Sequence, residues 1–495
     1  MAGRMQATET GRKWHLPKKR KFVSVVNGSP NGSEVEDESD KDYTPPAQAE
    51  KAKTPTGKAS VDSSSETESD SVAQGNNCSH VRSIAEWCKL PREVWVKIFS
   101  DVIKLEGGCL PVLMLLRRVC SVWSEVCLTP SLWRTIAFSK RTNGPSRVPQ
   151  AAVTWLANNT LHYARHMDLS GFSVSELEGI DSSLKRSKEL VALTLPTSKM
   201  HFTCTVVLSQ LTIYRCEIQH FQHFRPDLLQ NLTKLSLTLS SSAHYIQLNF
   251  NDYVAADMPL LEFLSLDGFV VDWTILVKTC VNLRHLTLVD CWRKNVQHDV
   301  AGLPKLQSCT LVEPDRDVAV HHLFRWHFGM RCETTHVLHC LEKCANLERL
   351  TLSGHTGMWA DMNYLVGHGI CLPSLRYLDL HTRYPPSGLW GSNNIEPFLT
   401  AFIQHSSSSL ESIEVKNLVI GDSLAAGELS CLRHLKLHHC YLTAPVCLKL
   451  LEACPELKSV SLLGNYQLPR SINQAFSADC FGPLKELLKA HMERT

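Results

Sequence analysis

The stretch "CVNLRHLTLVDC", residues 280–291, has leucine at its fourth, seventh and ninth positions and cysteine at both ends. Its L-x-x-L-x-L pattern recurs along the chain, and relaxed copies with another small or aliphatic residue fall in the gaps. Strict copies begin at Leu190, Leu232, Leu261, Leu283, Leu347, Leu375 and Leu432, and relaxed copies begin at Ala164, Leu208, Leu306, Leu410 and Leu457. Most successive copies lie 18 to 29 residues apart, so the pattern is a structural repeat.

The spacing has a mechanical reason. In "LRHLTL" the alternation of Leu286 and Leu288 predicts a short strand with both leucines inward, while Leu283 fills the layer before it. Segments such as "WTILVKTC" and "TAPVCLKLLEAC" have helical spacing and return the chain, so successive strands are parallel. Each unit buries its leucines only by stacking on neighbours, which explains the many copies.

Cysteines occupy two fixed places in the repeat. Cys280, Cys344 and Cys454 precede the first leucine by three residues, where we expect inward packing. Three others follow the last aliphatic residue by three positions, where leucine-rich repeats use Asn or Cys to bond turn backbone: Cys216, Cys291 and Cys440. We therefore expect small buried groups rather than metal ligands.

The period and pattern resemble those of leucine-rich repeats. The sequence predicts an α/β fold in which residues 164–475 form a curved solenoid with parallel strands on its concave face. Residues 139–163 are predicted to be a linker or helix leading into the repeats, and residues 476–495 a C-terminal capping helix. The longer intervals predict insertions at 313–346 and 381–409.

Residues 1–80 are polar and nearly free of large apolar side chains, which predicts a disordered tail. Within it, Lys18, Lys19, Arg20 and Lys21 resemble a short nuclear import signal, and the competing interpretation is a solvated charge run. The sequence thus predicts a location in the nucleus, with the cytoplasm as a second location.

The net charge of +2 does not indicate nucleic-acid binding, and the 19 cysteines in so long a chain indicate reduced thiols. No stretch approaches the length of a membrane span.

Residues 84–138 have the spacing of a small helical unit. Leu90 and Pro91 begin a first helix, and Gly107 and Gly108 end it. Pro111 is predicted to begin a second helix that continues through Trp123. About fifty residues make a poor independent core, so the excess apolar surface is expected to be completed by a partner. The competing interpretation is a helical subdomain that packs only on its neighbour.

The segments "LPREVWVKIF", "RRVCSVW" and "SLW" resemble the F-box in order and spacing. The resemblance implies docking on the Skp adaptor of an SCF-type cullin–RING ubiquitin ligase. It assigns adaptor binding to these positions: Leu90, Pro91, Ile98, Phe99, Val119, Cys120, Trp123, Leu132 and Trp133. The link "KLEGGCLP" departs from the short acidic link of many members, which puts the adaptor contacts there in doubt.

Together the two regions resemble the F-box/leucine-rich-repeat family. The resemblance implies a non-catalytic receptor that brings a protein substrate to the ligase for ubiquitination and degradation, with the chemistry in partner subunits and no cofactor. A ligase-independent nuclear scaffold is the alternative. No nucleotide-binding, serine-hydrolase or zinc-protease motif supports an enzyme. His336, His339, Cys340 and Cys344 could together form a zinc site, but the repeat role of Cys344 favours a structural interpretation.

The residues beside the inward leucines point outward and form the predicted substrate-binding face. The candidates are His285, Arg349, Tyr377, His381, His434, Lys436 and His438. The late strands are biased toward cationic or protonatable groups, which favours an acidic or phosphorylated ligand. A solvated polar face without a ligand is the competing interpretation, since Asp379 and Glu414 also lie there.

Overall fold

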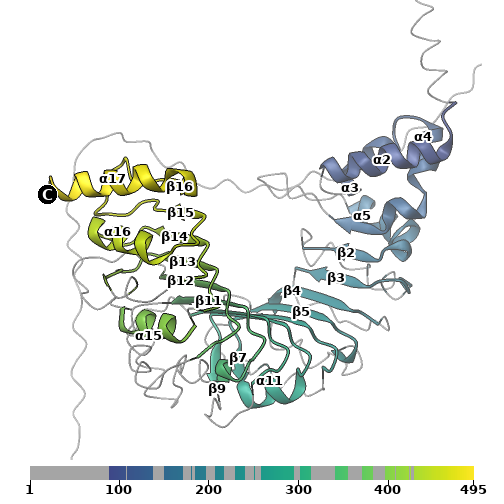
Figure 1. The fold of residues 1–495 in the computed structure, drawn as a ribbon. Coiled ribbons are helices and arrows are strands. Elements are labelled where there is room, and N and C mark those ends of the chain that lie inside the picture. The colour runs from purple at the N-terminus through teal and green to yellow at the C-terminus, as the bar shows by residue number, and fades with distance from the viewer. Residues whose placement is uncertain are drawn as a thin grey trace, which may run out of the picture. The chain divides into compact units, whose positions relative to one another are not determined.

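The fold was obtained as a computed structural model. It describes residues 89–106, 109–137, 150–170, 180, 184, 186–196, 207–216, 229–239, 250, 258–294, 302–313, 340–354, 371–382, 396–406, 408–422, 424 and 429–494. The basic run at 18–21 and most of the predicted insertion at 313–346 lie outside these residues, as do residues 383–395 of the second predicted insertion. Figure 1 shows the ribbon, with short strands stacked in chain order and α11, α15 and α16 on one side of the sheet.

The described residues form a main sheet of fourteen strands, whose order in the sheet follows the sequence. The strands pair in parallel up to β15, and β16 closes the sheet antiparallel to β15. Their bounds are β1 Thr135–Ala137, β2 His166–Asp168, β3 Ala192–Leu195, β4 Gln210–Cys216, β5 Lys234–Leu239, β6 Phe263–Asp267, β8 His285–Val289, β10 Ser308–Val312, β11 Arg349–Gly354, β12 Tyr377–Thr382, β13 Ser412–Lys416, β14 His434–His438, β15 Ser459–Ser461 and β16 Ala475–Ser477. β7 (Val270–Asp272) and β9 (Trp292–Lys294) form a separate parallel pair.

The repeat pattern places the core. The three repeat positions of every copy are buried, and none of these side chains is more than 6% exposed. Equivalent leucines align across the sheet, as Leu264 pairs with Leu286 and Leu266 with Leu288. Burying a leucine or isoleucine contributes about 1.5 to 3 kcal/mol, so the stacked layers are the main stabilising feature of the repeats. The predicted mixed α/β solenoid with parallel strands is confirmed.

Helices connect several of the strands. The predicted helical segments are confirmed as α11 (Trp273–Thr279) and α16 (Ala444–Ala453). Other helices are α5 (Gln150–Asn159), α15 (Glu396–Ser406) and α17 (Phe481–Met492), with 3₁₀ turns η2 at Leu161–Tyr163 and η6 at Ala478–Cys480. α17 buries Leu484 and Leu488 and lies against α16, so it covers the last repeat.

The N-terminal helical unit consists of α2 (Arg92–Glu106), α3 (Cys109–Leu116), α4 (Ser121–Cys127) and the 3₁₀ turn η1 (Pro130–Trp133). The single helix predicted from Pro111 to Trp123 is wrong, because a turn at 117–119 separates α3 from α4. Cys120 has an extended backbone with φ of −159°, and its sulfur accepts a hydrogen bond from the Trp123 backbone N–H at 3.5 Å. Cys120 therefore acts as the N-cap of a new helix.

Candidate functional site

The core of the helical unit is aromatic. Trp95, Phe99 and Trp123 meet pairwise, with ring centroids 5.0 to 5.8 Å apart. Trp133 is fully buried, and its indole N–H donates to the Cys127 carbonyl at 2.6 Å. Edge-to-face pairs contribute about 0.5 to 1.5 kcal/mol beyond burial, so these rings hold the short helices together.

The predicted adaptor-binding residues divide into buried and accessible groups. Phe99, Leu132 and Trp133 are buried, so these side chains are not accessible to a partner and stabilise the fold of the unit. Leu90, Cys120 and Trp123 are half-buried. The side chains of Pro91, Ile98 and Val119 are exposed, and these three are placed to contact a partner directly.

The same unit exposes further apolar side chains, and of these the sequence prediction selected Ile98 and Val119 alone. Val94, Ile98 and Leu105 share one stripe of α2 at i, i+4 and i+11, beside the face that buries Trp95 and Phe99. Further exposed apolar residues follow in the described chain: Leu115, Val119 and Leu128, of which Leu115 is 66% exposed. The stripe on α2 can be predicted from helical spacing alone. The exposure of Leu115 and Val119 depends on the break between α3 and α4. This set is called the apolar helix surface below.

The second candidate surface is the open face of the sheet, formed by the side chains that alternate with the buried aliphatic residues. Strand register aligns them in rows. The leading row holds the residue before the second aliphatic position and the middle row holds the residue between the second and third. From β3 to β11 the middle row is hydroxylic throughout: Thr194, Thr212, Ser236, Ser265, Thr287, Thr310 and Thr351.

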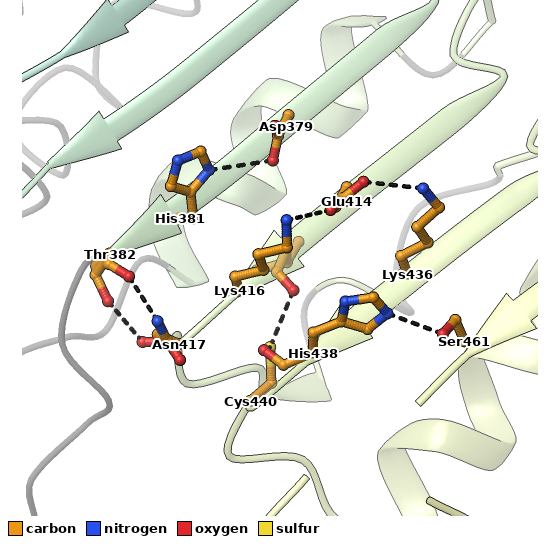
Figure 2. Close-up of polar contacts among 11 residues, drawn as sticks. Asp379, His381, Thr382, Glu414, Lys416, Asn417, Lys436, His438, Cys440 and Ser461 are labelled. Atoms are coloured by element: carbon orange, nitrogen blue, oxygen red, sulfur yellow. Dashed lines mark hydrogen bonds and ion pairs between the residues drawn. The ribbon is translucent and has the colours of Figure 1, made fainter. Parts of the chain in front are cut away.

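From β12 to β14 the middle row becomes charged, with Asp379, Glu414 and Lys436 in register. Figure 2 shows Glu414 between two ammonium groups, 2.5 Å from Lys416 and 3.1 Å from Lys436. Burial would raise the pKa of Glu414, but hydrogen bonds from both lysines outweigh it and hold that pKa below its ordinary value. The charges in this zone therefore neutralise one another.

The predicted substrate-binding histidines are also engaged. His381 lies 3.2 Å from Asp379, and His434 contacts the Ser459 hydroxyl at 2.8 Å. His438 contacts the Ser461 hydroxyl at 2.8 Å, as Figure 2 shows. Burial lowers the pKa of His438, so the neutral ring is favoured. The predicted bias of the late strands toward positive charge is thus smaller in the folded protein than residue types indicated.

The leading row carries a feature that sequence reasoning missed. The Lys234 ammonium lies over the Phe263 ring at 4.8 Å, and the Arg349 guanidinium lies over the Tyr377 ring at 4.4 Å. Phe263 also lies beside His285, with ring centroids 6.1 Å apart. The outward positions are readable from the repeat, and Lys234 occupies the same place as His285 and Arg349. The signal was therefore present two repeats upstream of His285, the first residue selected.

The recurrent cysteine places of the repeat are structural. Cys280, Cys344 and Cys454 are buried, and burial raises the thiol pKa of Cys280 to about 11 and of Cys454 to about 12. Cys291 and Cys440 are buried and donate to strand carbonyls at 3.2 to 3.4 Å, as predicted. The side chain of Cys216 lies outside the described residues. Thiols with such pKa values are protonated at neutral pH, which makes them weak nucleophiles.

Of the four candidate zinc ligands, His336 and His339 lie outside the described residues, and Cys340 and Cys344 are buried in the repeat core. Across the part of the chain that the structure describes, no three His, Cys, Asp or Glu side chains are grouped to hold a metal ion. Within that same part, no helix is long and apolar enough to cross a membrane.

Residues 87–139 match the F-box-like family. No curated protein matches the chain in sequence. Among solved structures, an internalin from Listeria monocytogenes is similar at 13% identity and a TM-score of 0.30, over 74% of this chain and 90% of the internalin. The repeat assignment rests on strand register and burial. The chain therefore combines an F-box-like segment with a leucine-rich-repeat sheet.

Proposed function

We propose that this chain is the substrate-recognition subunit of an SCF-type E3 ubiquitin ligase. The apolar helix surface docks on the Skp adaptor, and the open face of the sheet holds a protein substrate. The observation that carries the proposal is that the F-box-like segment exposes large apolar side chains such as Leu105, Leu115 and Val119. Exposed apolar patches mark protein interaction sites.

The proposed mechanism is proximity rather than catalysis. A receptor that holds its substrate beside the charged ubiquitin-conjugating enzyme raises the effective concentration of substrate lysines there. Such a receptor has no bond to break or form, so no residue of this chain is assigned a catalytic role. Ubiquitin transfer is left to the partner subunits.

The first test is affinity purification from cells with the proteasome inhibited. We expect the parent protein to recover the adaptor and the cullin, and Leu115→Asp with Val119→Asp to lose both, because a carboxylate cannot be buried in an apolar interface. The control is Leu463→Asp with Tyr466→Asp, which places the same charges on exposed apolar residues of the last repeats. Substrate recovery without cullin by the parent would instead identify a ligase-independent scaffold.

We further propose that the protein accumulates in the nucleus through Lys18, Lys19, Arg20 and Lys21, since an import receptor reads a short run of cations on an accessible segment. Replacing all four by alanine is expected to move a fluorescent fusion toward the cytoplasm. A matched variant replaces Lys41, Lys51, Lys53 and Lys58, which are dispersed cations of the same polar region. An equal shift in both variants, or in neither, would contradict the import role.

A further inference from the structure

We infer that the open face between β5 and β11 binds an extended peptide segment with two anionic side chains. The length per residue of an extended chain places these side chains about six residues apart. The inference rests on the proposed substrate-receptor function and names the chemistry of its substrate. Lys234 and Arg349 are the two anion-binding residues.

Both cations lack a carboxylate partner among the described residues, and each is held over an aromatic ring. Stacking leaves the in-plane N–H donors of a guanidinium available for a carboxylate or phosphate. It also restricts the side chain before binding, which reduces the entropy lost when a ligand is held. Lys234 and Arg349 are exposed, so a ligand reaches them without rearrangement of the sheet.

Several other basic residues on this sheet are already paired with carboxylates. Lys416 and Lys436 share Glu414. At the edge where the strands begin, Arg376 pairs with Glu411, and Arg284 lies 3.9 Å from Glu262. An anionic ligand would have to displace a carboxylate from any of these, whereas Lys234 and Arg349 offer uncompensated charge.

Strand order fixes the separation of the two cations. Lys234 lies on β5 and Arg349 on β11, with β6, β8 and β10 between them in the sheet. Four steps between neighbouring strands span about 19 Å. An extended peptide covers that span with about six residues. The ligand therefore runs across the strands, with one anion at each end of this interval.

The surface between the cations determines the rest of the ligand. Ser236, Ser265, Thr287 and Thr310 line it, and hydroxyls both donate and accept hydrogen bonds, which suits the backbone of an extended chain. Asp267, at the far end of β6, is the one carboxylate on the described open face from β5 to β11. It disfavours a third anion there, so the central residues of the ligand are uncharged.

The test uses the full chain and synthetic nine-residue peptides labelled with a fluorophore, measured by fluorescence anisotropy at fixed salt. One peptide carries phosphoserine at positions 2 and 8 with neutral residues between, one carries glutamate at the same places, and one carries unmodified serine. A fourth has its phosphoserines at positions 4 and 6. Tight binding of phosphoserine alone identifies phosphorylation as the source of charge, and equal binding of glutamate identifies an acidic sequence.

We expect Lys234→Ala and Arg349→Ala each to weaken binding of the matched peptide by about tenfold, the effect of one charge-assisted hydrogen bond. Lys436→Ala removes one cation from the same face and serves as the control. Because Lys436 is already paired with Glu414, we expect its replacement to change the affinity for the matched peptide by less than about twofold. The inference is overturned if Lys436→Ala weakens binding equally, if the closely spaced peptide binds as tightly, or if a short single-stranded oligonucleotide binds more tightly than any peptide. Adaptor co-purification by the same variants separates this result from the proposed ligase function, which it leaves unchanged.

Discussion

Single residues at the turn after each strand fix the direction in which the chain leaves the sheet. Two positions beyond the last buried aliphatic residue, the backbone takes positive φ at Gly268, Asp290, Asn417, His439 and Gly464. Asp, Asn and His are the non-glycine types that tolerate this region best. The side chain of the next residue points inward. In three repeats this side chain donates a hydrogen bond to a backbone carbonyl of the preceding repeat: Cys291, Cys440 and Asn465.

The cysteines at this place were predictable from a constant offset, and the same offset from Leu462 leads to Asn465. The positive φ was not predictable, because five different turns carry Gly, Asp, Asn and His without one shared residue type. The Asn465 side chain accepts from the Cys440 N–H at 2.8 Å and donates to the carbonyls of Leu437 and Leu462 at 2.9 and 2.8 Å. It therefore ties two turns together from a position that is 2% exposed.

Asn465→Ala is expected to lower the free energy of unfolding by about 2 to 3 kcal/mol, because it leaves buried backbone groups without partners. Asn346→Ala is the matched control, since exposed Asn346 makes one hydrogen bond, to the Pro304 carbonyl at 2.7 Å. Chemical denaturation of both variants gives the comparison. A loss for Asn465→Ala no greater than for the control would show that the turns do not depend on it.

At the scale of elements, register converts sequence-distant residues into neighbours. The inward positions of β13 and β14 follow from the repeat, but the contact between Glu414 and Lys436 joins residues 22 positions apart in the sequence. The same holds for Lys234 over Phe263 and for Arg349 over Tyr377. The sequence predicts which side chains face outward, whereas their partners depend on pairing of adjacent strands and on rotamers.

The charged zone predicts a dependence of stability on pH. Burial holds the pKa of His438 below its ordinary value of 6.5 against the pull of Glu414, and nearby Lys416, Lys436 and His439 lower it further. A depressed folded pKa means that the unfolded chain binds more protons in this range, so His438 contributes stability above pH 6.5 and loses it as pH falls.

His438→Gln keeps a polar group that can bond Ser461 and removes the titration. We expect a smaller loss of stability between pH 7 and pH 5 in this variant than in the parent, as measured by the midpoint of urea unfolding. His434→Gln changes an exposed histidine of the same strand and serves as control. Identical pH profiles for His438→Gln and the parent would contradict the assignment.

At the scale of the whole described chain, the F-box-like unit and the repeats share one core. β1 follows η1 directly and pairs in parallel with β2, so the sheet begins within the segment assigned to the helical unit. The Arg117 guanidinium lies 3.8 Å over the Trp155 ring of α5, and Trp155 lies 5.9 Å from Trp133. Sequence reasoning missed β1 because the buried residues at this place, Trp133 of η1 and Ile136 of β1, do not show the leucine pattern.

The fold could be predicted because leucine spacing specifies burial at each repeat, and Leu283, Leu286 and Leu288 are representative. The adaptor surface could be predicted only in part. The F-box resemblance identifies positions by type, and it does not distinguish core residues such as Phe99 and Trp133 from exposed ones such as Val119. That distinction depends on how α2, α3 and α4 pack together.

The most direct test of the central claim is isothermal titration calorimetry of the purified full chain with purified Skp adaptor at several temperatures. We predict one-to-one binding with a negative heat-capacity change, because the apolar helix surface leaves water on docking. Leu115→Asp with Val119→Asp should abolish the binding while the unfolding midpoint stays that of the parent, since both side chains are exposed. Absence of binding by the parent, or undiminished binding by the double variant, would contradict the account.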